Sequence, residues 1–284
     1  MGDDDRSTET FKGWRRPGPV PPGGVALSDG ETLDYLSGHW RIFQLKDGHR
    51  FSTDDVVLAW YATVCAPRVD RYLDIGSGIG SVALTVAWRL PGARVVTVEA
   101  QEISWRLAQR SIAYNGVVDR FTPLHGDLRD QAILDGHGPF DLVTGSPPYW
   151  AVGDAEPAKH PQAVPARLEV RGTIADYART AARVLAPGGV FCAVFQASQD
   201  ARARAAIDDA GLALVRARPV CFKEGVPAET SGLMLYCAHR REDLPDGWRR
   251  PPVVEPPLVI RTTTGGVHPE YAAVKLSFGF PPGG

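Results

Sequence analysis

No run of apolar residues in this 284-residue chain is long enough to cross a bilayer, which takes about 20 residues in a helix. Net charge is also nearly absent, because 31 Lys and Arg stand against 33 Asp and Glu. Domains that bind nucleic acid through bulk electrostatics are usually basic, so such binding here would need a local patch. The acidic, polar start MGDDDRSTET is unlike a secretory signal. We therefore expect a cytoplasmic protein with no membrane segment.

Cysteine is scarce, with four residues and no C-x-x-C pair. Cys65, Cys192, Cys221 and Cys237 lie far apart in the sequence, and most fall in expected helices or strands. This spacing matches neither the common zinc motifs nor the disulfide framework of a small secreted domain. We expect reduced cysteines in the core and no bound metal.

The sequence is organised around residues 71–80, RYLDIGSGIG, which predict a buried strand, a glycine turn and the start of a helix. Gly76, Gly78 and Gly80 allow a sharp turn and a close approach to a ligand, because no Cβ is in the way. Asp74 places a carboxylate at the carboxyl end of the strand, where open α/β sheets bind ligands. The first N–H groups of the following helix point at this turn.

Two common phosphate-binding motifs are missing from this turn. Ser81 stands where a dinucleotide fingerprint has its third glycine, and no Lys-Ser/Thr pair follows as in a P-loop. A carboxylate two residues before the first glycine suits a cationic or hydroxyl-rich ligand better than a phosphate. The alternative is a glycine-rich turn with a purely structural role.

Two further acids follow expected strands. Glu99 ends the run ARVVTVE, about 20 residues beyond the turn, where an acid can bind two ribose hydroxyls. Asp127 follows a third strand, although it could also be a surface loop acid. With Asp74 they would form one polar rim.

At this point the chain resembles the Rossmann-like S-adenosylmethionine-dependent methyltransferases. In that family the glycine turn cradles the methionine part of the cofactor, the second acid holds the ribose and the third lies near adenine. The resemblance implies S-adenosyl-L-methionine as cofactor. The implied cofactor-binding residues in this part of the chain are Asp74, Gly76, Gly78, Gly80, Glu99 and Asp127.

Strands and helices alternate along the core. Strands are expected near 71–75, 94–99, 121–125, 140–145, 190–196, 212–222 and 231–239, and helices near 54–64, 81–90, 102–115, 173–186 and 199–210. This alternation predicts an α/β fold of the Rossmann-like class I methyltransferase type, a seven-stranded mainly parallel sheet with helices on both faces. The last two strands would form an antiparallel hairpin.

Four parts are expected along the chain. Residues 1–24, rich in Pro, Gly and charge, predict a disordered tail. Residues 25–70 would form a hairpin and a helix that close over the cofactor, and residues 71–239 the methyltransferase core. Residues 240–284 would form an extension packed on the core, with a strand, a glycine turn and a short helix or strand between 257 and 280.

Residues 40–51 alternate apolar side chains on both sides of Asp47-Gly48, which predicts a hairpin turn at that pair. Ser52 or Thr53 would then cap a helix. Residues 44–60, QLKDGHRFSTDDVVLAW, resemble the bacterial tRNA1(Val) adenine-N6 methyltransferases, which carry a similar hairpin and an F-S-x-D-x-x-L-L pattern. The resemblance implies that Phe51 and Thr53 close over the methionine end of the cofactor.

A second motif follows the strand at 140–145, where the sequence reads Ser146-Pro-Pro-Tyr-Trp150. It resembles the (Asn/Asp/Ser)-Pro-Pro-(Tyr/Phe/Trp) motif of amino-group methyltransferases. An exocyclic amine is a poor nucleophile because its lone pair is shared with the ring. Ser146 Oγ and the Pro147 carbonyl can accept its two hydrogens, while Tyr149 and Trp150 stack on a base that is splayed out of its helix. The expected catalytic residues are Ser146, Pro147, Pro148 and Tyr149, and Ser146 is also counted with the cofactor-binding residues.

Ser146 departs from the tRNA family, which usually has Asn at this position. Serine lacks the amide geometry, and Ser-Pro-Pro also occurs in methyltransferases that act on cytosine N4. Ser146 therefore keeps an amino group as the acceptor and leaves open whether that group belongs to adenine or cytosine.

Residues 151–172 show no clear secondary structure, and a loop of this length is often a functional lid. Arg167, Arg171 and Lys159 could bind phosphates, or could equally be solvated arginines and a lysine on a surface loop. His160 is a possible general base. The basic pairs 240–241 and 249–250 could form an RNA-facing patch.

The leading hypothesis is an N-methyltransferase that acts on an exocyclic amino group, with N6 of an adenine in tRNA as the acceptor. Its expected site for the acceptor comprises Tyr149, Trp150, Arg167 and Arg171. Alternatives are a DNA amino-methyltransferase, a protein glutamine-N methyltransferase, a small-molecule N-methyltransferase, and an inactive subunit that binds the cofactor or RNA. We expect no metal, and a monomer or weak dimer.

Overall fold

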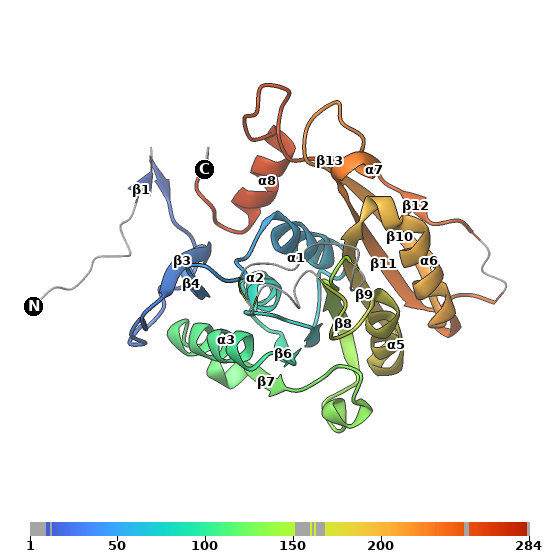
Figure 1. Ribbon diagram of the computed structural model, residues 1–284, viewed down its shortest axis with the longest axis horizontal. Coiled ribbons are helices and arrows are strands. Elements are labelled where there is room, and N and C mark those ends of the chain that lie inside the picture. The colour runs from blue at the N-terminus through green and yellow to red at the C-terminus, as the bar shows by residue number, and fades with distance from the viewer. Residues whose placement is uncertain are drawn as a thin grey trace, which may run out of the picture.

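The computed structural model describes residues 10–11, 13–150, 160, 162, 168–246 and 250–282. A central sheet runs through this part of the chain, with helices on both sides (Figure 1). Its seven main strands, in spatial order, are β7 (Phe121–His125), β6 (Arg94–Glu99), β5 (Arg71–Ile75), β8 (Phe140–Gly145), β9 (Leu185–Gln196), β11 (Leu233–Arg240) and β10 (Leu212–Cys221).

Parallel pairing holds the sheet from β7 to β9, and β11 is antiparallel to both of its neighbours. The expected seven-stranded, mainly parallel sheet with a closing hairpin is confirmed. Two strands of two residues each, β12 (Val253–Val254) and β13 (Leu258–Val259), add to the outer edge of β10. β13 is the strand expected after residue 257, whereas β12 leaves no periodic pattern in the sequence and was not expected.

The helices of the core lie within two residues of their expected bounds. They are α1 (Thr53–Cys65), α2 (Ser81–Arg89), α3 (Glu102–Tyr114), α5 (Ile174–Val184) and α6 (Asp200–Asp209). Further helices are α7 (Ala228–Ser231) and α8 (Pro269–Ser277). Single turns of 3-10 helix are η2 (Val118–Arg120), η3 (Gln131–Leu134), η5 (Ala197–Gln199) and η6 (Arg241–Asp243).

Alternation along the strands divides the core into two layers. Tyr72 and Leu142 face the layer that holds α1, α2 and α8, whereas Leu73 and Val143 face the layer that holds α5 and α6. Because successive strand residues point to opposite faces, a continuous apolar strand such as 71–75 must be covered on both sides. The sheet is therefore fully covered, and its polar ends are left for binding.

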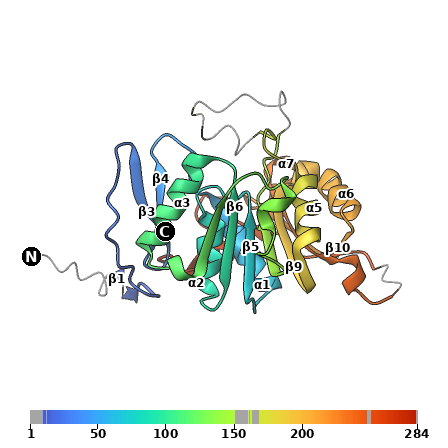
Figure 2. The ribbon, with the colours of Figure 1, turned by 90° about the horizontal axis from the view of Figure 1, so that it is seen from below.

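The hairpin before the core is displaced from its expected position. It consists of β3 (Glu31–Ser37) and β4 (Trp40–Leu45), joined at Gly38 and His39, and Gly38 takes a positive φ of 51°. The prediction of a turn at Asp47-Gly48 is wrong, because the partner of β4 lies upstream. Gly48 instead belongs to the connection from β4 to α1. Figure 2 shows this hairpin beside α3, at the end of the molecule opposite β10.

Residues 13–24 of the expected disordered tail are ordered, although most of them are exposed and only a few contacts tie them to the rest of the chain. Short strands β1 (Thr10–Phe11) and β2 (Trp14–Arg15) pair with each other. The Arg16 guanidinium stacks 3.7 Å from the Tyr35 ring centroid, and Gly23 N–H donates to the Tyr114 carbonyl at 3.1 Å. This segment thus contacts Tyr35 and Tyr114 of the following part of the chain, and composition alone does not reveal such contacts.

The chain ends as expected, with a strand, a glycine turn and a short helix. Thr262 N–H donates to the Gly266 carbonyl at 2.9 Å, and His268 caps α8. Figure 1 shows α8 over α1. None of the helices in the described residues is both apolar enough and long enough to cross a membrane.

Candidate active site

A cleft lies at the carboxyl ends of β5, β6 and β8, where the sequence predicts a polar rim. The structure brings most of the expected site residues to this cleft. Those that line it are Asp74, Gly76, Gly78, Glu99, Ser146, Pro147, Pro148, Tyr149 and Arg171. The glycine turn and the Pro-Pro-Tyr motif, about 70 residues apart in the chain, thus face one space.

The glycine turn has a positive φ at each of its three glycines, which only glycine adopts without strain. A Cβ on Gly76 would stand 1.8 Å from the Tyr177 hydroxyl, whereas one on Gly78 would meet nothing within 4 Å. Gly80 packs against Ala108 on α3, so it serves helix packing and does not line the cleft. The open side of Gly78 leaves room for a ligand directly above the backbone.

Asp74 is the most deeply placed acid of the rim, with 2% of its surface exposed. Thr144 Oγ1 donates to Asp74 Oδ1 at 2.5 Å, while Asp74 Oδ2 is buried without a hydrogen-bond partner among the described residues. Burial raises the pKa of Asp74 to about 7, against the Thr144 bond that lowers it. A buried carboxylate oxygen without a partner is costly, so a donor on a ligand would stabilise it.

Glu99 holds the neighbouring position on β6. Its Oε2 accepts from Gly78 N–H at 2.8 Å and its Oε1 from Gln101 N–H at 2.6 Å. Burial still raises the pKa of Glu99 against these two bonds. Each carboxylate oxygen has a second lone pair, which leaves two acceptors for a pair of hydroxyls.

Asp127 differs from the other two acids of the expected rim. Its carboxylate accepts from Arg129 Nε at 2.9 Å and from Arg129 Nη2 at 2.5 Å, and this partner lowers its pKa. It is not among the residues that line the cleft. The strand pattern alone could not show whether Asp127 would bind a ligand or pair with Arg129, two residues further on.

Two acids that were not among the expected site residues, Asp54 and Asp55, line the cleft. Asp55 accepts from Ser52 N–H at 2.8 Å and from Ser81 Oγ at 3.0 Å. Burial and the neighbouring Asp54 raise the pKa of Asp55 to about 7. Ser52 is the N-cap, as one of the two expected candidates. The sequence signal for these two acids was the pair Asp54-Asp55 directly after the F-S-T run at 51–53.

The Pro-Pro-Tyr motif forms a braced loop after β8. The Tyr149 hydroxyl donates to Asp54 Oδ2 at 3.0 Å, and its ring meets the Phe195 ring edge-on at 5.6 Å between centroids. Gln199 Nε2 donates to the Tyr149 carbonyl at 2.6 Å. Burial first, and then Asp54, raise the pKa of Tyr149, which keeps the phenol protonated as a donor. Ser146 is half-buried beside the cleft.

Several expected residues lie elsewhere. Phe51, Thr53 and Trp150 do not line the cleft; Phe51 packs on the core, and Trp150 is 36% exposed. Arg167 and Lys159 fall outside the described residues. His160 does not line the cleft, but its Nδ1 accepts from the N–H of Gln162, which does, at 3.2 Å.

Other lining residues gave no sequence signal because they come from the first turns of helices or from loops outside the recognised motifs. They are His49, Gln101, Ser104, Gln162 and Tyr177, together with Ser77 in the glycine turn. Gln162 bridges two of these segments, because it donates to Ser104 Oγ at 3.1 Å and accepts from His49 N–H at 2.7 Å.

The hydrogen-bond acceptors and the charge of the cleft fit S-adenosyl-L-methionine. Four acids, Asp54, Asp55, Asp74 and Glu99, line it against one arginine, Arg171, so it favours a cation. The cofactor carries a sulfonium, an ammonium and two ribose hydroxyls. The unpartnered oxygen of Asp74 and the spare lone pairs of Glu99 match these groups.

Among solved structures, a predicted O-methyltransferase from Agrobacterium tumefaciens matches 81% of this chain and 98% of its own, with a TM-score of 0.60 and 21% identity. At that identity the likeness establishes the class I methyltransferase fold alone.

Three curated relatives match by sequence. A tRNA1(Val) (adenine(37)-N6)-methyltransferase from Porphyromonas gingivalis is 36% identical over 36% of this chain and 41% of its own length. A 4-amino-L-phenylalanine/4-methylamino-L-phenylalanine methyltransferase from Streptomyces pristinaespiralis is 38% identical over 42% of this chain and 41% of its own. A release factor glutamine methyltransferase from Chlorobaculum tepidum is 32% identical over 46% and 47%. The matches span less than half the length of each relative.

The family model of the methyltransferase small domain matches residues 59–210, which is more than half of the 284 residues. The match includes the glycine turn, Glu99 and the Pro-Pro-Tyr motif. It confirms the expected methyltransferase domain with S-adenosyl-L-methionine as its cofactor. The chain belongs to the methyltransferase small domain family.

Proposed function

We propose that this protein methylates an exocyclic amino group, and that the acceptor is N6 of an adenine in tRNA. One observation carries the proposal. The Ser-Pro-Pro-Tyr loop at 146–149 opens into the same cleft as Asp74 and Glu99, so an amine bound at the loop would face the cofactor.

The cofactor-binding residues act through charge and hydrogen bonds. S-adenosylmethionine, when bound, supplies a methyl group on a positively charged sulfur, which is already a strong electrophile. Asp74 would accept from its ammonium through the unpartnered Oδ2, and Glu99 from its ribose hydroxyls. The glycine turn excludes side chains from the space between them.

The acceptor side of the cleft orients the amine. Ser146 Oγ and the Pro147 carbonyl would accept its two hydrogens, and the fixed φ of the two prolines holds that carbonyl in place. This leaves the nitrogen lone pair directed at the methyl group. Tyr149, fixed by Asp54, Phe195 and Gln199, holds the ring in place, and positioning of this kind supplies much of the rate. The proton released after transfer goes to water.

The choice of tRNA rests on the F-S-x-D pattern at 51–54 and on the relative named for that activity. Among the described residues that line the cleft, Arg171 is the arginine that could bind a phosphate. The basic pair expected at 240–241 does not support this choice, because Arg240 binds Asp243 at 2.7 Å and Arg241 is paired with Asp208.

A small aromatic amine is the second candidate. The relative named for 4-amino-L-phenylalanine has 38% identity, and Asp54 and Asp55 place negative charge near Tyr149, where a phosphate would be repelled. A free amino acid with its own ammonium group would be attracted by the same charge.

One experiment separates these candidates. Purified protein is incubated with methyl-labelled cofactor and, in parallel, with total tRNA, genomic DNA, a protein fraction and 4-aminophenylalanine. Label in tRNA that digests to N6-methyladenosine supports the proposal. Label in 4-aminophenylalanine alone supports the second candidate, and label in none of them, from protein that binds cofactor by calorimetry, contradicts both.

A further inference from the structure

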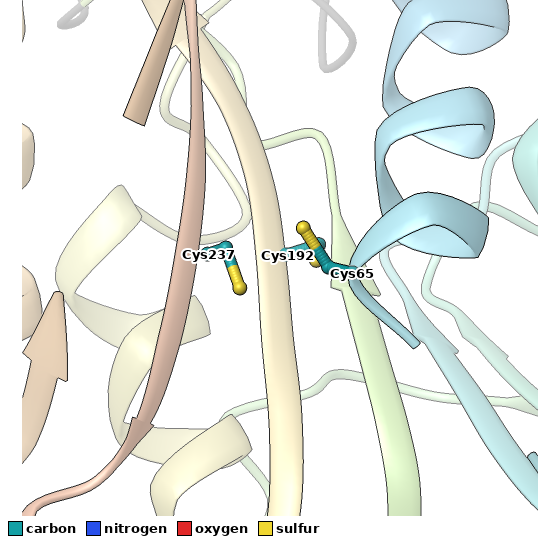
Figure 3. Close-up of side chains that lie close together, drawn as sticks. All are labelled: Cys65, Cys192 and Cys237. Atoms are coloured by element: carbon teal, nitrogen blue, oxygen red, sulfur yellow. The ribbon is translucent and has the colours of Figure 1, made fainter. Parts of the chain in front are cut away.

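Three of the four cysteines meet in space although they are far apart in the sequence. The Sγ atoms of Cys65, Cys192 and Cys237 all lie within 4.8 Å of one another. Figure 3 shows Cys65 at the end of α1 and the other two on adjacent strands, β9 and β11. All four cysteines are free, as expected, but their spacing in the sequence gave no sign that three of them meet.

The sheet explains why they meet. Cys192 and Cys237 are directly opposite partners in the antiparallel β9–β11 ladder, so their side chains stand on the same face. That face is covered by α1, whose last residue is Cys65. Cys192 and Cys237 are 0% and 2% exposed, whereas Cys65 is half-buried and gives the group a route to solvent.

An arginine borders the group. Arg216 Nη1 lies 3.9 Å from Cys65 Sγ and is itself fixed by Glu255 at 3.0 Å. Thiolate sulfur is the form that binds metal, and a neighbouring guanidinium favours the thiolate form.

We propose that Cys65, Cys192 and Cys237 bind one thiophilic metal ion through three sulfurs, with monovalent copper as the best fit. A metal about 2.3 Å from each sulfur holds the sulfurs roughly 3.8–4.0 Å apart, so the side chains need to close by less than about 1 Å. Soft thiolate ligands select Cu(I) and Zn(II). No fourth His, Cys, Asp or Glu in the described residues joins the group, which favours three-coordinate Cu(I) over tetrahedral Zn(II).

Binding of Cu(I) by the three cysteines releases protons and leaves a net charge. Cu(I) replaces the protons of the three thiols, which leave to solvent, and the resulting three thiolates and one Cu(I) carry a charge of −2 that Arg216 partly offsets. The site is separate from the cleft, because none of the three cysteines lines it. Asp54 and Asp55 lie at the opposite end of the 13-residue helix α1, roughly 15–17 Å away along its axis. The metal would tie the end of α1 to the sheet, independently of the proposed methyl transfer.

Competition with bicinchoninate tests the proposal on the reduced full-length protein under anaerobic conditions. We expect one Cu(I) per chain in the wild type and in Cys221→Ser, the matched control outside the group. Cys65→Ser, Cys192→Ser and Cys237→Ser should each bind at least tenfold more weakly. Zn(II) offered in place of Cu(I) should bind more weakly to the wild type. Equal binding by all five proteins, loss of binding in Cys221→Ser, or tighter Zn(II) than Cu(I) binding would overturn it.

Folding is controlled separately. Cys65→Ser, at a half-buried helix end, should keep the wild-type circular dichroism and cofactor affinity while losing copper. Cu(I) should raise the melting temperature of the wild type and Cys221→Ser and leave that of Cys65→Ser unchanged. A Cys192–Cys237 disulfide that survives dithiothreitol, detected as a mass deficit of two hydrogens, would also overturn the proposal because the ligands would be consumed.

Discussion

The two sides of the cleft are built in different ways. The cofactor side consists of a strand end and a glycine turn, Asp74 to Gly80, with one acid from the next strand. The acceptor side is assembled from α1, the loop after β8, β9 and the start of α6, which meet at Tyr149. One side is therefore a local motif, and the other is a product of the whole fold.

This difference predicts different sensitivities. The cofactor side should respond to changes of charge, because its acids are buried and matched to a cationic ligand. The acceptor side should respond to changes of shape, because Tyr149 acts by holding a ring in place. Substitutions on the two sides should thus separate cofactor affinity from turnover.

The largest expected effect is on the acceptor side. Tyr149→Ala removes the ring that positions the acceptor and should lower kcat by at least about 100-fold. Cofactor affinity, measured by calorimetry, should stay within about threefold, because the carboxylates of the opposite side are untouched. The matched control is Tyr236→Ala, another tyrosine bonded to an aspartate, at 3.0 Å from Asp200 and outside the cleft. Loss of cofactor affinity in Tyr149→Ala would erase the distinction between the sides.

The next effect is on the cofactor side. Asp74→Asn keeps the shape and removes the charge, and should weaken cofactor binding about 10- to 100-fold, as expected when a charged hydrogen bond of about 1.5–3 kcal/mol is lost. Asp127→Asn is the control, since Asp127 is held by Arg129 away from the cleft. Calorimetry should show a change of less than about twofold for that control. Equal losses in both variants would restore Asp127 to the cofactor site.

The sequence predicted the motif residues on both sides of the cleft, but not the contacts that hold Tyr149 in place, and the reason is physical. Asp74 and Gly78 act through backbone geometry fixed by their own few residues, so their spacing is informative. Asp54 acts only because α1 lies beside Tyr149, a contact across 95 residues. The strands and helices followed from periodicity, whereas the hairpin turn at Gly38-His39 and the packing of residues 13–24 depend on tertiary partners.

The three-cysteine group makes the same point within the core. Cys192 and Cys237 become neighbours only through the register of β9 against β11, and Cys65 joins them only where α1 ends. No spacing rule for metal motifs covers ligands supplied by three separate elements. Sequence spacing is thus a good guide to sites made by one turn and a poor guide to sites made by sheet pairing.

A smaller effect is expected at a contact within the acceptor side. Asp54→Asn weakens the bond from the Tyr149 hydroxyl and should lower kcat/KM about tenfold, with most of the loss in the acceptor KM. Asp200→Asn, which weakens the equivalent bond to Tyr236, is the control and should leave kcat/KM unchanged. A loss of the same size in both variants would indicate a general effect on folding.

The smallest expected effect is on the pH dependence of cofactor affinity. Asp55 and Asp74 have pKa values raised to about 7 by burial, so both are partly protonated at neutral pH. A cationic cofactor binds the ionised forms, and its affinity should therefore fall about fourfold per group between pH 8 and pH 6.5.

The stability of the cofactor-free protein should change in the opposite direction. A carboxyl whose folded pKa exceeds its unfolded value of 3.8 stabilises the fold below that value, and this contribution is lost as the pH rises to about 7. Thermal melts at several pH values, with and without cofactor, should therefore show a cofactor-induced increase in melting temperature that grows with pH in the wild type. The increase should grow less in Asp74→Asn, which cannot titrate at that position, and an increase independent of pH in the wild type would mean that neither acid faces the positive charge.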